Sequence, residues 1–399
     1  MANATLSDYT NVATDRFNKA VPIYLHNKVP LLKIFNQGKT EGFDAEKNFI
    51  LPFQYQQPHG TNWTVEGAAT PTALLSKFEQ MTLSWKKFVG AIRLSEESID
   101  LTKGSKTFID GWSRESAGLL RTIKNDLDTA LHRRGTGSLC TAASYSGQVV
   151  TVDSTKYLEP GMVLDGYDSS DNQDVNGCVV TSIDSATTFT CTGTVTSVDA
   201  GTLFYKEGSW VTGLDRAAMG IDGIVDDDAG TFQGLSRNTY GFLKAKVTDG
   251  STPGTNEALT LARMRGVIDS ISTGSYNGTP DCIYTSIGGY NAYTDIMRSA
   301  NQPIETMPAK DGFPGGAKYH QGNKVLPVIA SSKAEANTMF FLSKPTLFKY
   351  FGKQGWADKD GVMQRVAGYL IYESLYRGFC NFGTTWPEAN GRLNDITET

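Results

Sequence analysis

The stretch from Ser105 to about Arg134 carries the longest regular pattern in the chain. Apolar residues recur in it at spacings of three and four, and no proline interrupts them, which is typical of one amphipathic helix. At ~1.5 Å per residue such a helix would run roughly 40 Å. Mixed charges, Asp128 among them, occupy the other side and suit water or a polar neighbour. The basic end, His132 to Arg134, complements the negative pole of the helix.

The composition bounds the class of protein. A chain of 399 residues predicts two or three domains and can bury a substantial core without disulfides or metals. Its 41 glycines, 17 tyrosines and 19 phenylalanines favour strands and turns over a helical bundle. The formal charge of −5 argues against a dedicated nucleic-acid binder, which is usually basic. This charge does not exclude a structural protein that encloses nucleic acid without binding it strongly.

The five cysteines are odd in number and form no CxxC pair. Neither a disulfide framework nor a zinc ribbon is therefore indicated, and reduced thiols are the simplest expectation. The residues from Met1 to Thr10 are polar and show no signal-peptide pattern. No run of about eighteen apolar residues occurs, so we expect no membrane-spanning helix.

Residues 1–41 read as an N-terminal arm. Prolines at Pro22 and Pro30 limit it to short helices, and its apolar patches around Tyr24 and Phe35 need a surface to pack against. That surface can be the core of the same chain or a neighbouring subunit, and the sequence leaves both alternatives open.

Residues 42–94 read as a long hairpin. Two strands are predicted, from Phe43 to Tyr55 and from Gln80 to Leu94, in which Met81, Leu83 and Trp85 alternate with polar residues. The polar tip between them carries Trp63 and Glu66. A long two-stranded ribbon is marginal alone, so another surface has to stabilise it. An ordinary two-stranded excursion in a monomer is the competing interpretation.

Residues 139–209 change in character, because Ser, Thr, Val, Gly and Asp dominate there. Short strands separated by turn residues predict a small all-β barrel or sandwich. The predicted strands are 148–152, 161–164, 178–183, 188–192 and 203–205. An acidic loop inside this module holds Asp168, Asp171 and Asp174, and oxygen-rich loops can bind calcium. The spacing does not fit an EF-hand, so an exposed solvated loop is the other interpretation.

Residues 210–399 predict an α+β body. Helices are expected over 259–271 and 288–299 and a long loop over 301–322. Strands are expected over 282–285, 325–330, 339–342, 347–351, 364–367 and 369–382.

No catalytic motif accompanies this architecture. The sequence has no GxxxxGK[ST], GxSxG or HExxH pattern and no zinc spacing. The four histidines, His26, His59, His132 and His320, are far apart without local partners, so surface or hydrogen-bonded roles are expected. We expect no enzyme activity, no catalytic residue and no cofactor.

The order of arm, long hairpin, long helix and mixed body resembles the major capsid proteins of tailed bacteriophages, which have the Hong Kong 97-type fold. The most specific segment is Gly223 to Asp227 followed by Thr231 to Tyr240, which reads GIVDD and then TFQGLSR.TY. The helix, strand and helix between 259 and 297 are similar to those of the family's axial domain. Residues 325–328 and 336–342 resemble its closing strand pair, and 66–67 with 79–95 resemble the far side of its extended loop.

The resemblance implies a division of the chain. Residues 1–41 would be the N-arm, 42–94 the extended loop, 95–138 the peripheral domain with the spine helix, and 139–209 an all-β insertion domain. Residues 210–399 would form the axial domain interleaved with the rest of the peripheral domain. The expected contacts between subunits are Trp63, Glu66, Trp85, Phe35 and Tyr24.

The resemblance also implies partners and a location. The family assembles pentamers and hexamers into an icosahedral shell around double-stranded DNA, without sequence specificity, in a virion that forms in the host bacterial cytoplasm. A portal belongs to such a shell, and separate scaffolding and decoration proteins can accompany it. Two rival functions stay open: the shell of a cellular nanocompartment with the same fold, and a β-rich adhesin or glycan-binding protein that uses residues 139–209.

Overall fold

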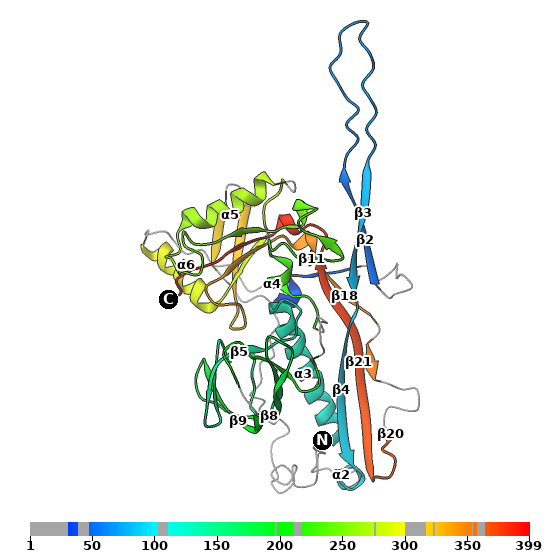
Figure 1. Ribbon diagram of the computed structural model, residues 1–399, viewed down its shortest axis with the longest axis vertical. Helices are drawn as coiled ribbons and strands as arrows, with labels where there is room; N and C mark the ends of the chain where they lie inside the picture. The colour runs from blue at the N-terminus through cyan, green and yellow to red at the C-terminus, as the bar shows by residue number, and fades with distance from the viewer. Residues whose placement is uncertain are drawn as a thin grey trace.

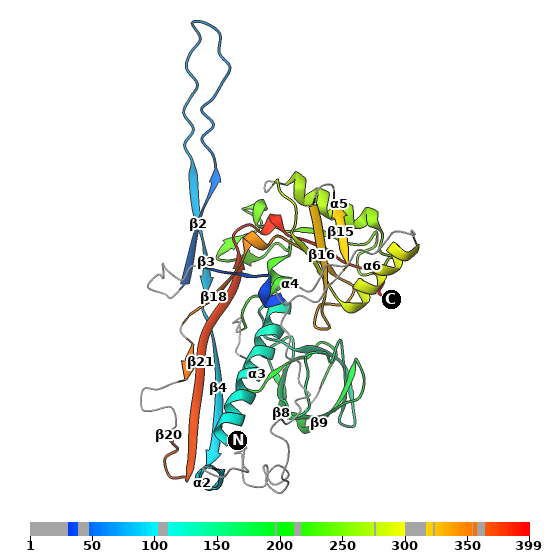
Figure 2. The same cartoon turned by 180° about the vertical axis from the view of Figure 1, so that it is seen from behind.

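The computed structural model describes residues 31–38, 48–102, 111–195, 198–210, 217–274, 277–299, 317–321, 324–352, 354–356 and 364–399. The first residues of the predicted long helix, 105–110, lie outside these ranges, as do Tyr24, Phe43 and most of the predicted 301–322 loop. Within the described ranges, a narrow ribbon projects from one end of an elongated molecule, and a helix-covered sheet and a small barrel lie beside a long spine (Figures 1 and 2).

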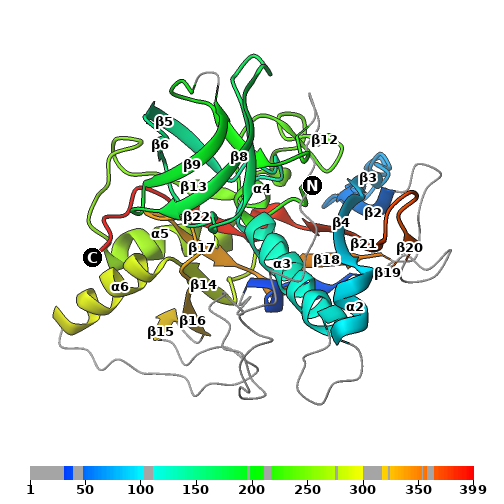
Figure 3. The same ribbon diagram turned by 90° about the horizontal axis from the view of Figure 1, so that it is seen from below.

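The spine combines one helix with one sheet. Helix α3, Gly111–His132, confirms the predicted amphipathic helix over the described part of its length. It follows α2, Glu96–Thr102, and packs along β4, Lys86–Ser95 (Figure 3). Gly90 permits close contact, because an added Cβ there would lie 2.7 Å from Leu119 Cδ1.

The spine sheet is organised around β21, Ile371–Thr384, which extends the predicted 369–382 strand. Strand β4 lies antiparallel along one side of β21. The other strands that pair with it are β18, Leu347–Phe351, β19, Gly355–Trp356, and β20, Gln364–Arg365. Of the predicted 364–367 strand, only 364–365 are paired.

The ribbon consists of β2, Asn48–Gln56, and β3, Lys77–Ser84, which pair antiparallel. The predicted alternation is confirmed, since Met81 and Leu83 are buried. The prediction of one continuous strand from Gln80 to Leu94 was wrong. The strand breaks at Trp85, after which β4 leaves the ribbon and pairs with β21.

Six antiparallel strands close a barrel between residues 140 and 206 in the order β10-β5-β6-β9-β8-β7. Their interior-facing residues form one apolar core, which includes Val150, Phe189 and Phe204. The prediction missed the first strand. The strands are β5, Cys140–Ser146, β6, Val149–Val152, β7, Val163–Tyr167, β8, Gln173–Ile183, β9, Thr188–Val195, and β10, Leu203–Lys206.

The remaining body is a mixed six-stranded sheet in the order β13-β22-β17-β14-β16-β15. Strands β16 and β17 both pair with β14 and not with each other, which corrects the closing pair expected from 325–328 and 336–342. The strands are β13, Lys246–Thr248, β14, Cys282–Thr285, β15, Lys318–Gln321, β16, Lys324–Ala330, β17, Met339–Leu342, and β22, Gly391–Leu393.

Alternation along β14 and β17 divides the apolar side chains between two cores. Ile283 and Phe341 face the core under α5, Leu261–Thr273, and α6, Ile287–Ser299. Tyr284 and Phe340 face the core that reaches the end of α3. Helices α5 and α6 confirm the two helices predicted over 259–271 and 288–299. The short helices are α4, Ile221–Ile224, η1, Leu31–Lys33, η2, Gly241–Leu243, η3, Lys344–Thr346, and η4, Pro387–Ala389.

The described end of the N-terminal arm docks on its own chain. Leu31, Ile34 and Phe35 are buried in the core beside α3, and β1, Asn36–Gln37, pairs parallel with β18. Phe35 contacts Phe382 edge to face at 5.6 Å between ring centroids. For this segment the same-chain alternative is therefore the right one.

Candidate subunit interface

The tip of the ribbon carries the three most exposed large apolar side chains among the described residues. Between Gln56 and Lys77 the chain runs out and back without strand pairing, and Trp63 is fully exposed. Val65 and Leu75 are 79% and 80% exposed. Isolated exposed apolar residues are ordinary, but several along one projecting ribbon make it a candidate interaction surface.

The base of the ribbon is clamped to a second hairpin, formed by β11, Thr231–Phe232, and β12, Leu235–Ser236. The Thr82 amide donates to the Gln233 carbonyl at 2.8 Å. Gly234 has φ +81°, and an added Cβ would lie 2.3 Å from Thr82 Oγ1. The Tyr240 hydroxyl donates to Glu79 at 3.1 Å, and this hydrogen bond raises the pKa of Tyr240.

The clamp coincides with the segment that carried the resemblance, Gly223–Asp227 and Thr231–Tyr240. Arg237 is buried and donates to the carbonyls of Gly223 and Leu243 at 2.9 and 3.2 Å. Its guanidinium lies 4.4 Å from the centroid of Phe232. The buried arginine therefore holds the β11–β12 hairpin in the position that receives the ribbon.

Aromatic rings fill the pivot where the ribbon meets the spine. Trp85 stacks on Phe49 at 5.1 Å and meets Phe379 edge to face at 5.1 Å. Gly352 leaves room for the indole, because an added Cβ would lie 2.2 Å from it. The ribbon therefore projects from a packed base.

A second exposed apolar group lies at the other end of the spine sheet, where β20 and the start of β21 meet β4 (Figure 1). Tyr369 and Leu370 are 64% and 57% exposed. Val89 and Leu375 are also exposed, but they lie further along the sheet, where Val89 pairs with Arg377 and Leu375 with Ala91. We call Tyr369 and Leu370 the distal patch.

The charged side of α3 meets both environments that its pattern allowed, because Lys124 is exposed and Asp128 is buried against a polar neighbour. This carboxylate is buried 3.5 Å from Lys333 Nζ. The Lys333 carbonyl accepts from the hydroxyl of Tyr157 at 2.9 Å, and Tyr157 belongs to the barrel. A buried polar junction thus joins α3, the mixed sheet and the barrel.

His132 belongs to the same junction, so its expected role as a cationic helix end is wrong. Its Nε2 lies 2.6 Å from the Tyr284 hydroxyl, and its Nδ1 lies 2.6 Å from the Asp128 carbonyl. Burial lowers its pKa to about 3. At neutral pH the imidazole is therefore uncharged.

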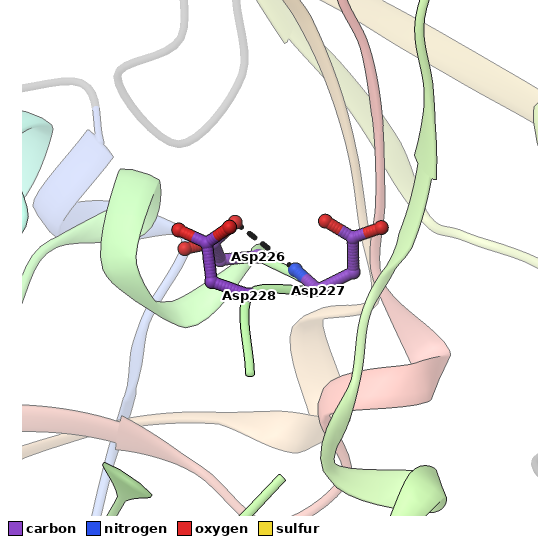
Figure 4. A group of neighbouring side chains, drawn as sticks. All are labelled: Asp226, Asp227 and Asp228. Carbon is purple, nitrogen blue, oxygen red and sulfur yellow. Dashed lines mark hydrogen bonds between the residues drawn. The ribbon is translucent and has the colours of Figure 1, made fainter. Parts of the chain in front are cut away.

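Three consecutive acids, Asp226, Asp227 and Asp228, bring carboxylate oxygens within 4.8 Å of one another (Figure 4). Arg134 contacts Asp226 and Asp228 at 3.2 and 2.8 Å, and Arg392 contacts Asp226 at 3.4 Å. Burial raises the pKa of Asp226, and the two guanidiniums oppose that rise. Through Asp226 and Asp228 the cluster forms an ionic junction between the end of α3 and the mixed sheet.

The calcium candidate in the barrel is a loop with its own hydrogen bonds. Asp168 accepts from the amides of Ser170 and Asn172 at 2.8 Å each, and from the Asn172 side chain at 2.9 Å. These bonds lower the pKa of Asp168. Asp174 accepts from Thr202 at 3.1 Å. A metal site at Asp168, Asp171 and Asp174 stays a prediction.

The five residues expected at the interface lie in different environments. Trp63 and Glu66 are exposed at the ribbon tip. Phe35 is buried in its own core, which corrects its assignment to a contact across subunits. Trp85 is half-buried with intramolecular ring contacts, and Tyr24 lies outside the described residues. The distal patch was missed, because Tyr369 and Leu370 were assigned to the strand predicted over 369–382 and lie in the turn before it.

The fold resembles those of solved shell proteins over nearly the whole chain. The capsid asymmetric unit of cyanophage A-1(L) has a TM-score of 0.58 at 14% identity, covering 97% of this chain and 98% of that one. The capsid of an empty GTA particle has a TM-score of 0.53 at 8% identity, covering 100% of both chains. The holo-SrpI encapsulin complex from Synechococcus elongatus has a TM-score of 0.50 at 9% identity, covering 99% and 96%.

Comparison of the sequence alone finds no relative. No protein-family model and no curated protein sequence matches the chain. Among the described residues, no helix is long and apolar enough to span a membrane. The structural likenesses therefore carry the assignment: the chain has the fold of phage major capsid proteins, as the resemblance predicted.

Proposed function

We propose that the protein is the major capsid protein of a tailed bacteriophage, which assembles with copies of itself into an icosahedral shell around double-stranded DNA. The observation that carries this proposal is the capsid fold combined with a ribbon tip whose exposed apolar side chains, Trp63, Val65 and Leu75, are not covered by the described part of the same chain. Obligate interfaces commonly bury more than ~2,000 Å², so the ribbon alone is one part of the contact.

The position of the apolar surfaces supports ring formation. The ribbon tip and the distal patch lie at opposite ends of the molecule (Figure 1). Contacts between two different surfaces are head to tail, and they close into rings when the rotation allows it. Pentamers and hexamers are rings of this kind.

The finer assignments belong to the same proposal. Residues 1–41 would be the arm, 42–94 the extended loop, 95–138 the peripheral domain with its spine helix, and 139–209 a projecting insertion domain. Residues 210–399 would complete the axial and peripheral domains. A portal, a separate scaffolding protein and a decoration protein are proposed partners, with assembly in the host cytoplasm and the virion as the final location.

A cellular nanocompartment shell is the second candidate, because the encapsulin SrpI is among the similar structures. The contents of the particle distinguish the two functions. Purified shells that contain double-stranded DNA support the phage capsid, whereas shells that enclose a protein cargo support the compartment. A stable monomer that binds glycans through the barrel would support the adhesin.

The variant Trp63→Ala tests the ribbon tip as the interface anchor. Burial of a large aromatic ring at an interface contributes about 2 kcal/mol or more, so the variant should raise the concentration needed for particle formation roughly 30-fold. Asn62→Ala, also exposed at the tip, is the matched control. Light scattering against protein concentration gives the threshold. Equal thresholds for both variants would remove Trp63 from the interface.

A further inference from the structure

Three asparagines in this chain are followed directly by glycine: Asn176, Asn277 and Asn390. Such an asparagine can lose its side-chain amide without an enzyme, because the backbone nitrogen of the next residue can attack the side-chain carbonyl carbon. Glycine favours this attack, since it has no Cβ to hinder the approach and its backbone is conformationally permissive. The three pairs have the same local chemistry, so the fold decides which of them reacts.

The pair Asn390–Gly391 is held inside the mixed sheet. Asn390 is 0% exposed, its Oδ1 accepts from the Ser343 amide at 2.9 Å, and its Nδ2 donates to the Trp386 carbonyl at 3.3 Å. Gly391 begins β22, which pairs with β13 on one side and β17 on the other. Attack by the Gly391 nitrogen would break these hydrogen bonds and turn a buried strand, so this pair is protected.

The pair Asn176–Gly177 is exposed at its asparagine, but its attacking nitrogen is already engaged. Asn176 lies in β8, within the part of the strand that pairs with β9. The Gly177 amide donates to Oδ1 of the buried Asp165 at 3.0 Å. Because that hydrogen bond has to break before the nitrogen can attack, this pair is protected as well.

The pair Asn277–Gly278 differs from the other two. It lies between α5 and β14, where the Asn277 amide donates to the Gly274 carbonyl at 3.0 Å and Asn277 has φ +48°. The Asn277 side chain is exposed. Within the described residues, neither this side chain nor the Gly278 amide makes a hydrogen bond. No contact of that kind therefore keeps the two reacting groups apart.

We propose that Asn277 is a site of spontaneous modification, at which water converts the side-chain amide to a carboxylate through a cyclic imide formed with Gly278. The Gly278 nitrogen loses its proton and bonds to Asn277 Cγ, and the side-chain nitrogen takes up that proton and leaves as ammonia. Water then adds to either carbonyl of the ring and opens it, which gives aspartate or isoaspartate. One water is consumed and one ammonia is released, and no group is oxidised or reduced.

The modification would add a negative charge next to an existing ion pair. Lys324 Nζ donates to the Thr279 carbonyl at 2.9 Å and lies 2.7 Å from Asp281 Oδ1. Thr279 is two residues from Asn277 in the sequence, so a carboxylate at position 277 would increase the negative charge near Lys324. Isoaspartate would also lengthen the backbone by one methylene just before β14. The inference does not depend on shell assembly, because it concerns one chain.

Peptide mapping by mass spectrometry tests the proposal on the full chain. The folded protein is incubated for days in mildly alkaline buffer and digested, and each asparagine–glycine peptide is scored for the mass gain that separates a carboxyl from an amide. We expect conversion at Asn277, with Asn176 and Asn390 at least about tenfold slower because each reacts only after local opening. In concentrated urea the three rates should become similar, since glycine follows all three.

Two variants supply the matched comparison. Gly278→Ala should slow the conversion of Asn277 about tenfold or more, because the added Cβ hinders the attack. Thr279→Ala keeps the asparagine–glycine pair and should react like the wild type. The wild-type map decides the question even when a variant folds poorly.

An intact Asn277 in the folded protein, at a time when the chain in urea has reacted, would overturn the proposal. Conversion of Asn176 or Asn390 in the folded protein as fast as that of Asn277 would overturn it too. Neither result bears on particle formation, so a failure here is distinct from a failure of the proposed capsid function.

Discussion

Buried polar residues join three parts of this molecule, which are α3, the mixed sheet and the barrel. Asp128 lies on the charged side of α3 and His132 at its basic end, and both are buried against the mixed sheet and the barrel. Partner removal at such a site leaves a buried polar group unsatisfied, which commonly costs about 1–3 kcal/mol. Periodicity shows where apolar residues face, but it cannot show which charges a later segment covers.

His132 gives the folded protein a pH dependence of predictable sign. Burial lowers its pKa from 6.5 to about 3, so between these values the unfolded chain binds a proton that the folded chain does not. Its contribution to stability is complete above pH 6.5 and falls by up to ~1.4 kcal/mol per pH unit on acidification toward pH 3.

Thermal unfolding as a function of pH measures this contribution. His132→Gln should flatten the decline below pH 6.5, whereas the same substitution at the exposed His320 should leave it unchanged. Identical pH profiles for the wild type and His132→Gln would contradict the assignment.

Asp165 makes a second prediction at this scale. It is buried in the barrel and accepts from the amides of Gly177 and Gly208 at 3.0 and 2.9 Å. Asp165→Ala should destabilise the protein by about 1–3 kcal/mol because two backbone donors lose their partner. Asp199→Ala, at an exposed carboxylate of the same barrel, should cost no more than ~0.5 kcal/mol. Urea denaturation of both variants provides the comparison.

Among the elements, the hairpin of β11 and β12 fixes the position of the ribbon on the body of the chain. The hairpin of β11 and β12 receives β3 through Thr82 and Gln233, with Gly234 in the left-handed region. The ribbon therefore leaves the body from a fixed base, and its tip is placed by contacts made far along the sequence.

Gly234→Ala should disturb this clamp. The position has φ +81° and an added Cβ would meet Thr82 Oγ1 at 2.3 Å, so we expect a loss of stability of about 1–3 kcal/mol. Gly230→Ala is the control, because nothing lies within 4 Å of its added Cβ. Hydrogen exchange at the Thr82 amide should rise in the first variant only. Unchanged protection there would mean that the clamp does not hold the ribbon.

The helices and strands that could be predicted from the sequence are those whose local pattern of apolar and turn residues is sufficient to define them. The apolar stripe of Met264, Val267 and Ile271 predicted α5, and short strands between turn residues predicted most of the barrel. Strand β22 was missed because its middle residue is Arg392, whose burial depends on a carboxylate 170 positions away in the sequence, Asp222. The break at Trp85 was missed because the partners of β3 and β4 are distant segments.

At the scale of the whole molecule, the order of the segments predicted the capsid fold, whereas the interface could be predicted only in part. Trp63 is exposed as an interface residue has to be, but Phe35 is used by its own core. The sequence pattern does not show whether an exposed-looking apolar residue packs into its own chain, as Phe35 does, or stays exposed, as Trp63 does. Only the three-dimensional packing distinguishes these two cases.

Electron microscopy of the full chain tests the central claim most directly. The protein would be purified from bacterial cells and imaged over a range of salt and protein concentrations, with and without co-expression of a scaffolding protein. Closed shells of uniform size, built from rings of five and six subunits, are the predicted result. A monodisperse monomer under every condition, with Trp63 still open to chemical labelling, would contradict the claim that this chain is a shell subunit.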